Sequence, residues 1–394
     1  MRVEFTRAFL ALLAASCSDS DPKPTLVTIE TTNPPALVVF RDETSTAWRD
    51  VEAVGATTFE ITTLGLYEVI VACEVPGIRA SVRLLARSPA DEPHVERPCA
   101  PPVDPAAVTV RGRMLDSGGV GLGDRFQSSS QQDWIFMRSL SPGTFDLVMV
   151  AGSSNVGFDQ IAIRRDLVIA GETDLGTIDI AQEGPQPLIP MSFTATNLLP
   201  GESQNSTVIL FAAGSFAFLH NSFPNASGWN VRVAPESILR PTDLQTVVLN
   251  AGGSSGSSGT QSTARTFVRD LRPGDPTLVR LPEPLGPVTF EASADRLAVT
   301  WSTLPKYDEV SLRRENSPGI SPQARSHEII LTRAFVDATD ATSTAIDFAD
   351  VPGFKPEWRL DPAVRELRVF STQRGASSSG HESAGVAESI APTP

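Results

Sequence analysis

Hydrophobic residues recur at every second position in many short stretches of the chain. Clear examples are residues 67–73, 145–149 and 297–301. An alternation of period two is typical of a β-strand with one buried face, and the glycine, proline, asparagine and serine residues between the runs favour turns. After residue 17, no long stretch has the 3.6-residue period of an amphipathic helix. The pattern predicts an all-β protein of tandem antiparallel β-sandwich modules.

Proline-rich and turn-rich segments divide the chain into units of the usual domain size. A length of 394 residues fits three to four such modules, if each holds about 100 residues. We predict four β-sandwiches, over residues 25–102, 103–185, 186–285 and 286–372. Residues 373–394 are rich in serine, glycine and alanine and contain few large apolar side chains, so we predict a disordered C-terminal tail.

The N-terminus has the organisation of a secretory signal peptide. A short basic start precedes the apolar stretch Ala8–Ala15, which is too short to span a bilayer, and Ser16 and Cys17 follow it. The segment Leu13-Ala-Ala-Ser-Cys17 resembles the lipobox of bacterial lipoproteins. That resemblance implies cleavage before Cys17, lipidation of its thiol, and delivery of the protein to the outer membrane or the cell surface. Residues 18–24 would then form a polar tether. Secretion without a lipid is the alternative.

The cysteine count adds a disulfide to this expectation. Of three cysteines, lipidation of Cys17 leaves Cys73 and Cys99, both in the first module. An exported protein passes through an oxidising compartment, so we predict that these two are bonded. Two free thiols are the alternative.

Two modules resemble known sandwich families. The motif L-x-P-G recurs at Leu140–Gly143, Leu198–Gly201 and Leu271–Gly274. With the strand that follows it, residues 140–147 resemble the hairpin of carboxypeptidase-regulatory and transthyretin-like sandwiches. The run from Pro287 to Trp301 resembles the first strands of a fibronectin type III module, which implies that Trp301 fills the core between two sheets. The whole chain resembles multi-module Ig-like and fibronectin type III-like bacterial lipoproteins, which implies a location in the cell envelope and a fold of tandem β-sandwiches.

Charge excludes one large class of function. The chain has 46 acidic and 32 basic residues, a net charge of −14. A nucleic-acid-binding protein needs a basic surface that displaces counterions from phosphates, so we expect no nucleic-acid partner.

The sequence offers little catalytic or metal-binding chemistry. None of the four histidines has a metal-binding spacing, and His327 is expected on the surface at the end of a strand. The glycine-rich segment 116–124 lacks the lysine of a phosphate-binding loop, and we interpret it as a hairpin loop. Four aspartates are close enough in sequence to supply calcium ligands from loops: Asp337, Asp340, Asp347 and Asp350. For Asp347, which alternates with Ile346 and Phe348, the exposed face of a strand is the alternative. We predict no enzyme activity, no cofactor and no bound metal.

The best candidate for a ligand site lies in the third module. Asn221, Phe223, Asn225 and Trp229 fall in one stretch with the loop formers Pro224 and Gly228. Aromatic faces beside amide groups suit a sugar or a peptide. The alternative places Phe223 and Trp229 in the core, and burial of Trp229 would decide for it.

These inferences favour a non-enzymatic lipoprotein of the cell envelope that binds or displays at the bacterial surface. Its expected partners are the membrane, through the lipid anchor, and a carbohydrate or protein of the envelope. A hydrolase of envelope polysaccharide or peptide is one alternative, because paired carboxylates cannot be recognised by spacing. A subunit of a secretion or surface assembly is the other.

Overall fold

The computed structural model contains β-strands almost throughout. It describes residues 24–75, 79–97, 99, 106–153, 157–222, 229–255, 261–271, 275–283, 288–301, 308–315, 324–339, 342–360, 367–374 and 382–390. Within these ranges, α-helix is confined to α2 (Arg333–Thr339). Short 3-10 turns are η1 (Ile180–Glu183), η2 (Glu236–Ile238), η3 (Phe348–Asp350) and η4 (Pro356–Trp358). None of the described helices is long and apolar enough to cross a membrane. The sheets confirm the all-β sandwich class.

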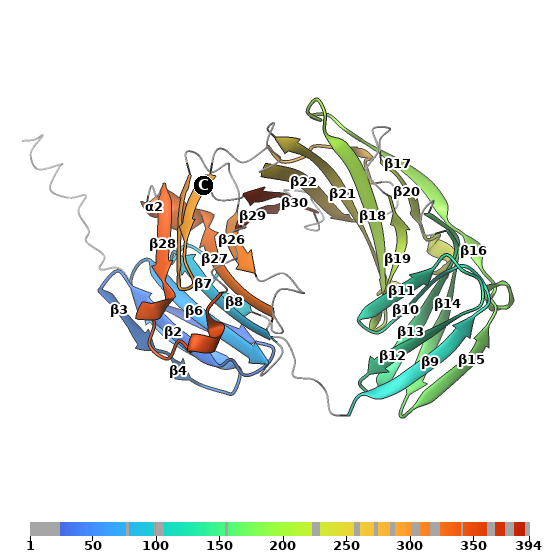
Figure 1. Cartoon of the computed structure of the whole chain (residues 1–394), viewed down its shortest axis with the longest axis horizontal. Helices are drawn as coiled ribbons and strands as arrows, with labels where there is room; N and C mark the ends of the chain where they lie inside the picture. Colours follow the sequence, from blue (N-terminus) through green and yellow to red (C-terminus); the bar gives the residue numbers. More distant parts are fainter. Residues whose placement is uncertain are drawn as a thin grey trace, which may run out of the picture.

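One sheet of twelve strands extends through both halves of the molecule, and we call it the long sheet (Figure 1). Its strands, in spatial order, are β19 (Ser215–Asn221), β18 (Ser203–Ala212), β21 (Leu244–Ser255), β22 (Gln261–Asp270), β30 (Glu382–Ile390), β29 (Leu367–Arg374), β26 (Glu309–Glu315), β27 (Ala324–Thr332), β7 (Arg79–Arg87), β6 (Tyr67–Val75), β2 (Leu37–Asp42) and β3 (Ser45–Asp50). Neighbours in this sheet are antiparallel except for β27 and β7, which pair in parallel. This pair joins the fourth predicted module to the first.

The first and fourth modules form one lobe of three layers, drawn in blue and orange in Figure 1. The N-terminal outer sheet covers one face of the long sheet and contains β4 (Glu52–Ala53), β5 (Thr58–Thr63), β1 (Thr25–Thr31) and β8 (His94–Arg97). The C-terminal outer sheet covers the other face and contains β24 (Val288–Ala292), β25 (Arg296–Trp301) and β28 (Ser343–Asp347).

Alternation along β27 explains why these two modules share their cores. Ile329 and Leu331 face the core beneath the C-terminal outer sheet, whereas Ile330 faces the core beneath the N-terminal outer sheet. Trp301 is 4% exposed in the former core, in the place between sheets that the fibronectin type III resemblance implies. Apolar side chains therefore lie on both faces of this strand, and each face is covered by a different outer sheet.

The second and third modules form the other lobe, drawn in teal and green in Figure 1. The inner sheet of the second module contains β11 (Arg125–Ser129), β10 (Gly118–Leu122), β13 (Gly143–Ser153), β14 (Gly157–Ile169) and β16 (Gln186–Pro187). Its outer sheet contains β12 (Trp134–Leu140), β9 (Val108–Met114) and β15 (Thr173–Ile178). A short sheet of β20 (Trp229–Val233), β17 (Ile189–Ala195) and β23 (Leu278–Val279) packs on the long sheet in the third module.

These two modules also share a core. Leu147 and Met149 of β13 face the core of the second module, and Val148 and Val150 face the core of the third. The four ranges predicted as modules thus lie in two pairs, and within each pair apolar side chains from both ranges share a core.

The predicted disordered tail is wrong for residues 382–390. They form β30, which pairs antiparallel with β22 on one side and with β29 on the other. The segment has few large apolar residues. It nevertheless forms a strand because β22 and β29, whose edges would otherwise have unpaired backbone groups, provide hydrogen-bond partners along it. Residues 375–381 and 391–394 lie outside the described residues.

Candidate functional site

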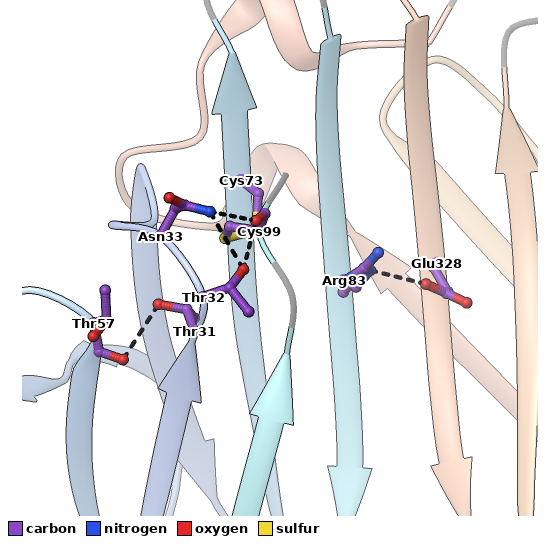
Figure 2. Close-up of a disulfide and its surroundings, with 8 residues drawn as sticks. All are labelled: Thr31, Thr32, Asn33, Thr57, Cys73, Arg83, Cys99 and Glu328. Atoms are coloured by element: carbon purple, nitrogen blue, oxygen red, sulfur yellow. Dashed lines mark hydrogen bonds and ion pairs between the residues drawn. A yellow bond between two sulfur atoms is a disulfide. The ribbon is translucent and has the colours of Figure 1, made fainter. Parts of the chain in front are cut away.

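The predicted disulfide between Cys73 and Cys99 is confirmed (Figure 2). Cys73 belongs to β6 and Cys99 follows β8, so the bond ties the long sheet to the N-terminal outer sheet, and both residues are buried. Thr32 Oγ1 and Asn33 Nδ2 donate hydrogen bonds of 2.6 and 2.9 Å to the Cys99 carbonyl oxygen. The segment after β8 is thereby fixed against β1.

A cross-strand ion pair accompanies the joint between the first and fourth modules. Arg83 of β7 lies opposite Glu328 of β27 in the parallel register, and the Arg83 Nε to Glu328 Oε2 distance is 3.1 Å (Figure 2). Cys17, the predicted lipidation site, and the tether up to residue 23 lie outside the described residues.

The structure describes two of the four residues of the predicted ligand site, Asn221 and Trp229. Asn221 ends β19 with an exposed side chain, whose Oδ1 accepts a 3.1 Å hydrogen bond from Thr207 Oγ1. Phe223 and Asn225 lie outside the described residues. Trp229 begins β20 and is 1% exposed.

The prediction that Trp229 is presented to a ligand is wrong. Its ring packs in the core of the third module, and its Nε1 donates a 3.1 Å hydrogen bond to the Asn250 carbonyl oxygen. The ring fills the space between the short sheet and the long sheet, and a backbone carbonyl satisfies its single polar group. The residue is a core residue, which was the alternative.

The structure instead places an open pocket of about 440 Å³ between the second and third modules. We call it the inter-module pocket. It is lined by Gly123, Asp124, Phe211, Ala212, Ala213, Gly214, Ser215, Phe216 and Thr242. The turn from β10 to β11 provides one wall, and the turn from β18 to β19 provides another. The volume is within the range of small-molecule sites.

Glycines allow the two turns to approach each other. A Cβ atom on Gly121 would lie 2.1 Å from the Phe216 carbonyl oxygen, so β10 can pack against β19 only without a side chain there. Gly123 has a φ of +64°, and its N–H donates a 2.9 Å hydrogen bond to Ser215 Oγ. The interpretation of segment 116–124 as a hairpin loop is wrong for Gly118–Leu122, which form β10, and the hairpin turn is limited to Gly123 and Asp124.

Aromatic rings form one side of the inter-module pocket. Phe211 is 43% exposed and lies opposite Phe216 in the β18–β19 pair, with 6.3 Å between ring centroids. Phe216 in turn contacts Phe218 edge to face, at 5.7 Å. Asp124 adds an 85% exposed carboxylate. An aromatic face beside a carboxylate fits a ligand with both an apolar surface and hydroxyl or amide groups.

A buried ion-pair network fixes the pocket walls relative to each other. Arg165 donates 2.7 Å hydrogen bonds to Asp146 Oδ2 and to Asp243 Oδ2, and both carboxylate side chains are 0% exposed. The Asp146 N–H also donates to the Ala213 carbonyl oxygen at 3.0 Å, in the turn that lines the pocket. Asp146 and Arg165 belong to the second module and Asp243 to the third, so the network spans the joint.

His327 is a core residue, so its predicted position on the surface is wrong. It is 1% exposed in β27, its Nε2 lies 2.9 Å from the Trp358 carbonyl oxygen, and its ring centroid is 4.4 Å from that of Phe348. Burial lowers its pKa to about 4, against a partial opposing effect of the hydrogen bond to Trp358. The imidazole therefore fits the core in its neutral form.

Two of the aspartates considered as calcium ligands have local partners. Asp337 forms an ion pair with Arg333 in α2, and Asp347 Oδ1 accepts a 3.0 Å hydrogen bond from the Ala349 N–H at the start of η3. Asp340 lies outside the described residues. In the described ranges, the groups that could hold a metal ion are Glu30, His94 and Glu96, on a different sheet.

Comparisons with known proteins add little to these observations. No family model matches the sequence, and no curated protein matches it. A solved structure of the chicken CNTN1 FN1–FN3 domains aligns over 95% of this chain and 91% of that chain, with 11% sequence identity and a TM-score of 0.16. The assignment of the fold rests on this chain's own strands and cores, which define a multi-module β-sandwich protein with a disulfide in its first module.

Proposed function

We propose that the chain is an exported, lipid-anchored protein of the bacterial envelope that binds or displays at the surface and catalyses no reaction. The observation that carries this proposal is the bond between Cys73 and Cys99. Structural disulfides persist in compartments outside the cytosol. The signal sequence ending at Cys17 agrees with that location and supplies the anchor.

The inter-module pocket is the binding site that the geometry favours. It combines the exposed ring of Phe211 with the Asp124 carboxylate, and buried contacts hold both of its walls. Ser215 is 5% exposed, and its hydroxyl accepts a hydrogen bond from Gly123, which gives it a structural role. The pocket thus offers surface for recognition of a saccharide or a peptide, which are the ligands expected at the envelope.

The anchor is tested by expression in a bacterial host followed by fractionation. We expect the full chain in the membrane fraction, with a diacylglyceryl group on Cys17 detectable by mass spectrometry of the N-terminal peptide. Cys17→Ala should release the protein or block its processing. A wild-type protein that is soluble and cleaved at another position would contradict the anchor while leaving the binding proposal open.

Binding is tested with muropeptides and a panel of neutral oligosaccharides as probes. Phe211→Ala and Asp124→Asn should each weaken binding, and Ile135→Ala is the control, because Ile135 is 66% exposed on β12 and does not line the pocket. Equal binding by all three variants would exclude the pocket. Release of new reducing ends or of free amines from the probes would favour the hydrolase alternative.

A further inference from the structure

The exposed face of the N-terminal outer sheet concentrates acidic side chains around one histidine. The parallel pairing of β1 with β8 places Glu30 opposite Glu96 and Thr28 opposite His94. On the other side of β1, Glu60 lies opposite Thr28, and Glu52 of β4 lies opposite Glu60. Side chains two positions apart share a face of a strand. Four glutamates and His94 therefore point to the same side of this sheet.

Three of these side chains converge. His94 Nε2 lies 3.7 Å from Glu30 Oε2 and 3.6 Å from Glu96 Oε1. All three ligand atoms lie within 4.8 Å of one another. The separations exceed those of an N–H to O hydrogen bond. They match the edges of a metal tetrahedron, because ligands at about 2.1 Å from zinc lie about 3.4 Å apart.

Two of the carboxylates on this face lie close enough to repel each other. Glu30 and Glu96 are directly opposite each other, and like charges in that position destabilise a sheet. Among the described residues, the basic side chain that lies within 4 Å of both carboxylates is His94. The neighbouring Arg97 guanidinium forms an ion pair with Glu309 of the long sheet. A bound divalent ion would offset the repulsion between the two glutamates.

The backbone beneath the three ligands is fixed. The Thr28 N–H donates a 2.9 Å hydrogen bond to the Pro93 carbonyl oxygen just before β8, and the disulfide at Cys99 holds the chain just after it. The site is therefore built on two paired strands, which favours binding because little ordering is needed.

We propose that Glu30, His94 and Glu96 form a Zn²⁺ site with a coordination position open to solvent. An imidazole nitrogen favours Zn²⁺ over Ca²⁺ and Mg²⁺, and two carboxylates fall short of the oxygen ligands that Ca²⁺ requires. Three protein ligands and an open position are the usual set of a zinc site that accepts a further ligand. The side chains of His94 and Glu30 are 40% and 49% exposed, so the ion is accessible from outside. This proposal is independent of the proposed function, and it differs from the sequence-based expectation of no metal.

Zinc titration of the full chain by calorimetry tests the site, with Cys17→Ala in every variant so that no thiol competes. We expect one Zn²⁺ per chain. His94→Ala and Glu30→Gln should each weaken binding at least about tenfold, which is about 1.4 kcal/mol. Glu52→Gln is the matched control, since it removes one charge from the same face outside the ligand set, and it should change the affinity less than about twofold.

Two further measurements distinguish coordination from general attraction to an acidic face. Co²⁺ bound to the same chain should show the visible bands of a tetrahedral nitrogen and oxygen site, and His94→Ala should abolish them. Zn²⁺ should raise the midpoint of thermal unfolding of the parent chain but not of the His94→Ala variant, because a ligand stabilises only the state that binds it. Absence of Zn²⁺ binding, equal affinity for Ca²⁺, or an equal loss in Glu52→Gln would overturn the proposal.

Discussion

At the scale of single residues, two buried side chains use backbone carbonyls as hydrogen-bond partners. Trp229 donates from its indole nitrogen to Asn250, and the His327 ring nitrogen lies within hydrogen-bonding distance of the Trp358 carbonyl. In both cases a large ring is buried, and one of its nitrogen atoms has a backbone carbonyl partner from a distant part of the sequence. Both residues therefore contribute to folding, and their energetic roles can be measured.

Trp229→Ala should strongly destabilise the protein. The change removes a ring that is 1% exposed in the core of the third module, and truncations of this kind cost about 3–5 kcal/mol. Denaturant unfolding followed by circular dichroism measures the loss. The exposed Asn221→Ala is the control and should change stability by less than about 0.5 kcal/mol. A loss below about 1 kcal/mol for Trp229→Ala would show that the ring is not a core element.

His327 should make the protein less stable as the pH falls below neutrality. Burial lowers its pKa from the ordinary imidazole value of 6.5 to about 4 in the folded protein. As the pH falls, the unfolded chain takes up this proton before the folded protein does. The contribution of His327 to the free energy of unfolding is therefore fully present above pH 6.5 and is lost between pH 6.5 and pH 4. It does not change further below pH 4. The total contribution is about 3 kcal/mol.

His327→Gln tests this dependence, because glutamine cannot titrate. The free energy of unfolding, measured in urea at pH 7 and pH 4.5, should fall more steeply for the parent than for the variant. Taking the difference between the two proteins removes the contribution of the carboxylates. Parallel pH profiles would show that His327 is not buried in its neutral form.

At the scale of elements, strand alternation and the disulfide govern the N-terminal outer sheet. The Cys73–Cys99 bond closes a segment with a sequence separation of 26 residues. It thereby connects β6 in the long sheet to the end of β8, the strand that contains His94 and Glu96. The disulfide constrains the chain at the end of β8, and the proposed metal site lies on the exposed face of the same strand.

The double variant Cys73→Ala/Cys99→Ala should be less stable, because the end of β8 is no longer bonded to β6. For a loop with a separation of 26 residues, the chain-entropy account gives a loss of about 3 kcal/mol. Unfolding in guanidinium, with and without a reductant, measures it. The reduced parent should be about as stable as the double variant, and equal stability of the oxidised parent and the variant would contradict the prediction.

At the scale of the whole molecule, the long sheet connects two lobes through β30 and β29 (Figure 1). β30 pairs with β22 of the third module and with β29 of the fourth. Without it, β22 and β29 would each present unpaired backbone groups. Exposed edges of this kind favour association with other chains.

A chain ending at Arg374 should therefore be more expanded than the full chain, or should self-associate. Small-angle X-ray scattering and sedimentation velocity measure the radius of gyration and the oligomeric state. A chain ending at Ile390 keeps β30 and is the matched control. Identical behaviour of all three chains would show that β30 does not hold the lobes together.

The sequence predicted correctly what depends on local pattern. Period-two alternation identified strands, and the even number of remaining cysteines identified the pair Cys73–Cys99. The fibronectin type III resemblance placed Trp301 in a core, where the structure has it. These features follow from burial of one face of a strand and from thiol chemistry, and both can be recognised within a short segment.

Tertiary structure alone decided which surfaces meet. Glu30 and His94 are distant along the chain and become neighbours only through the parallel register of β1 and β8. Trp229 has the sequence context of a loop aromatic, but it packs in the core of the third module. The segment 382–390 has the composition of a polar tail, but it pairs with the edges of β22 and β29. Alternation predicts that a strand has an apolar face, but it does not indicate which other strand or sheet will cover that face. That choice depends on non-local hydrogen bonding and packing across the whole molecule.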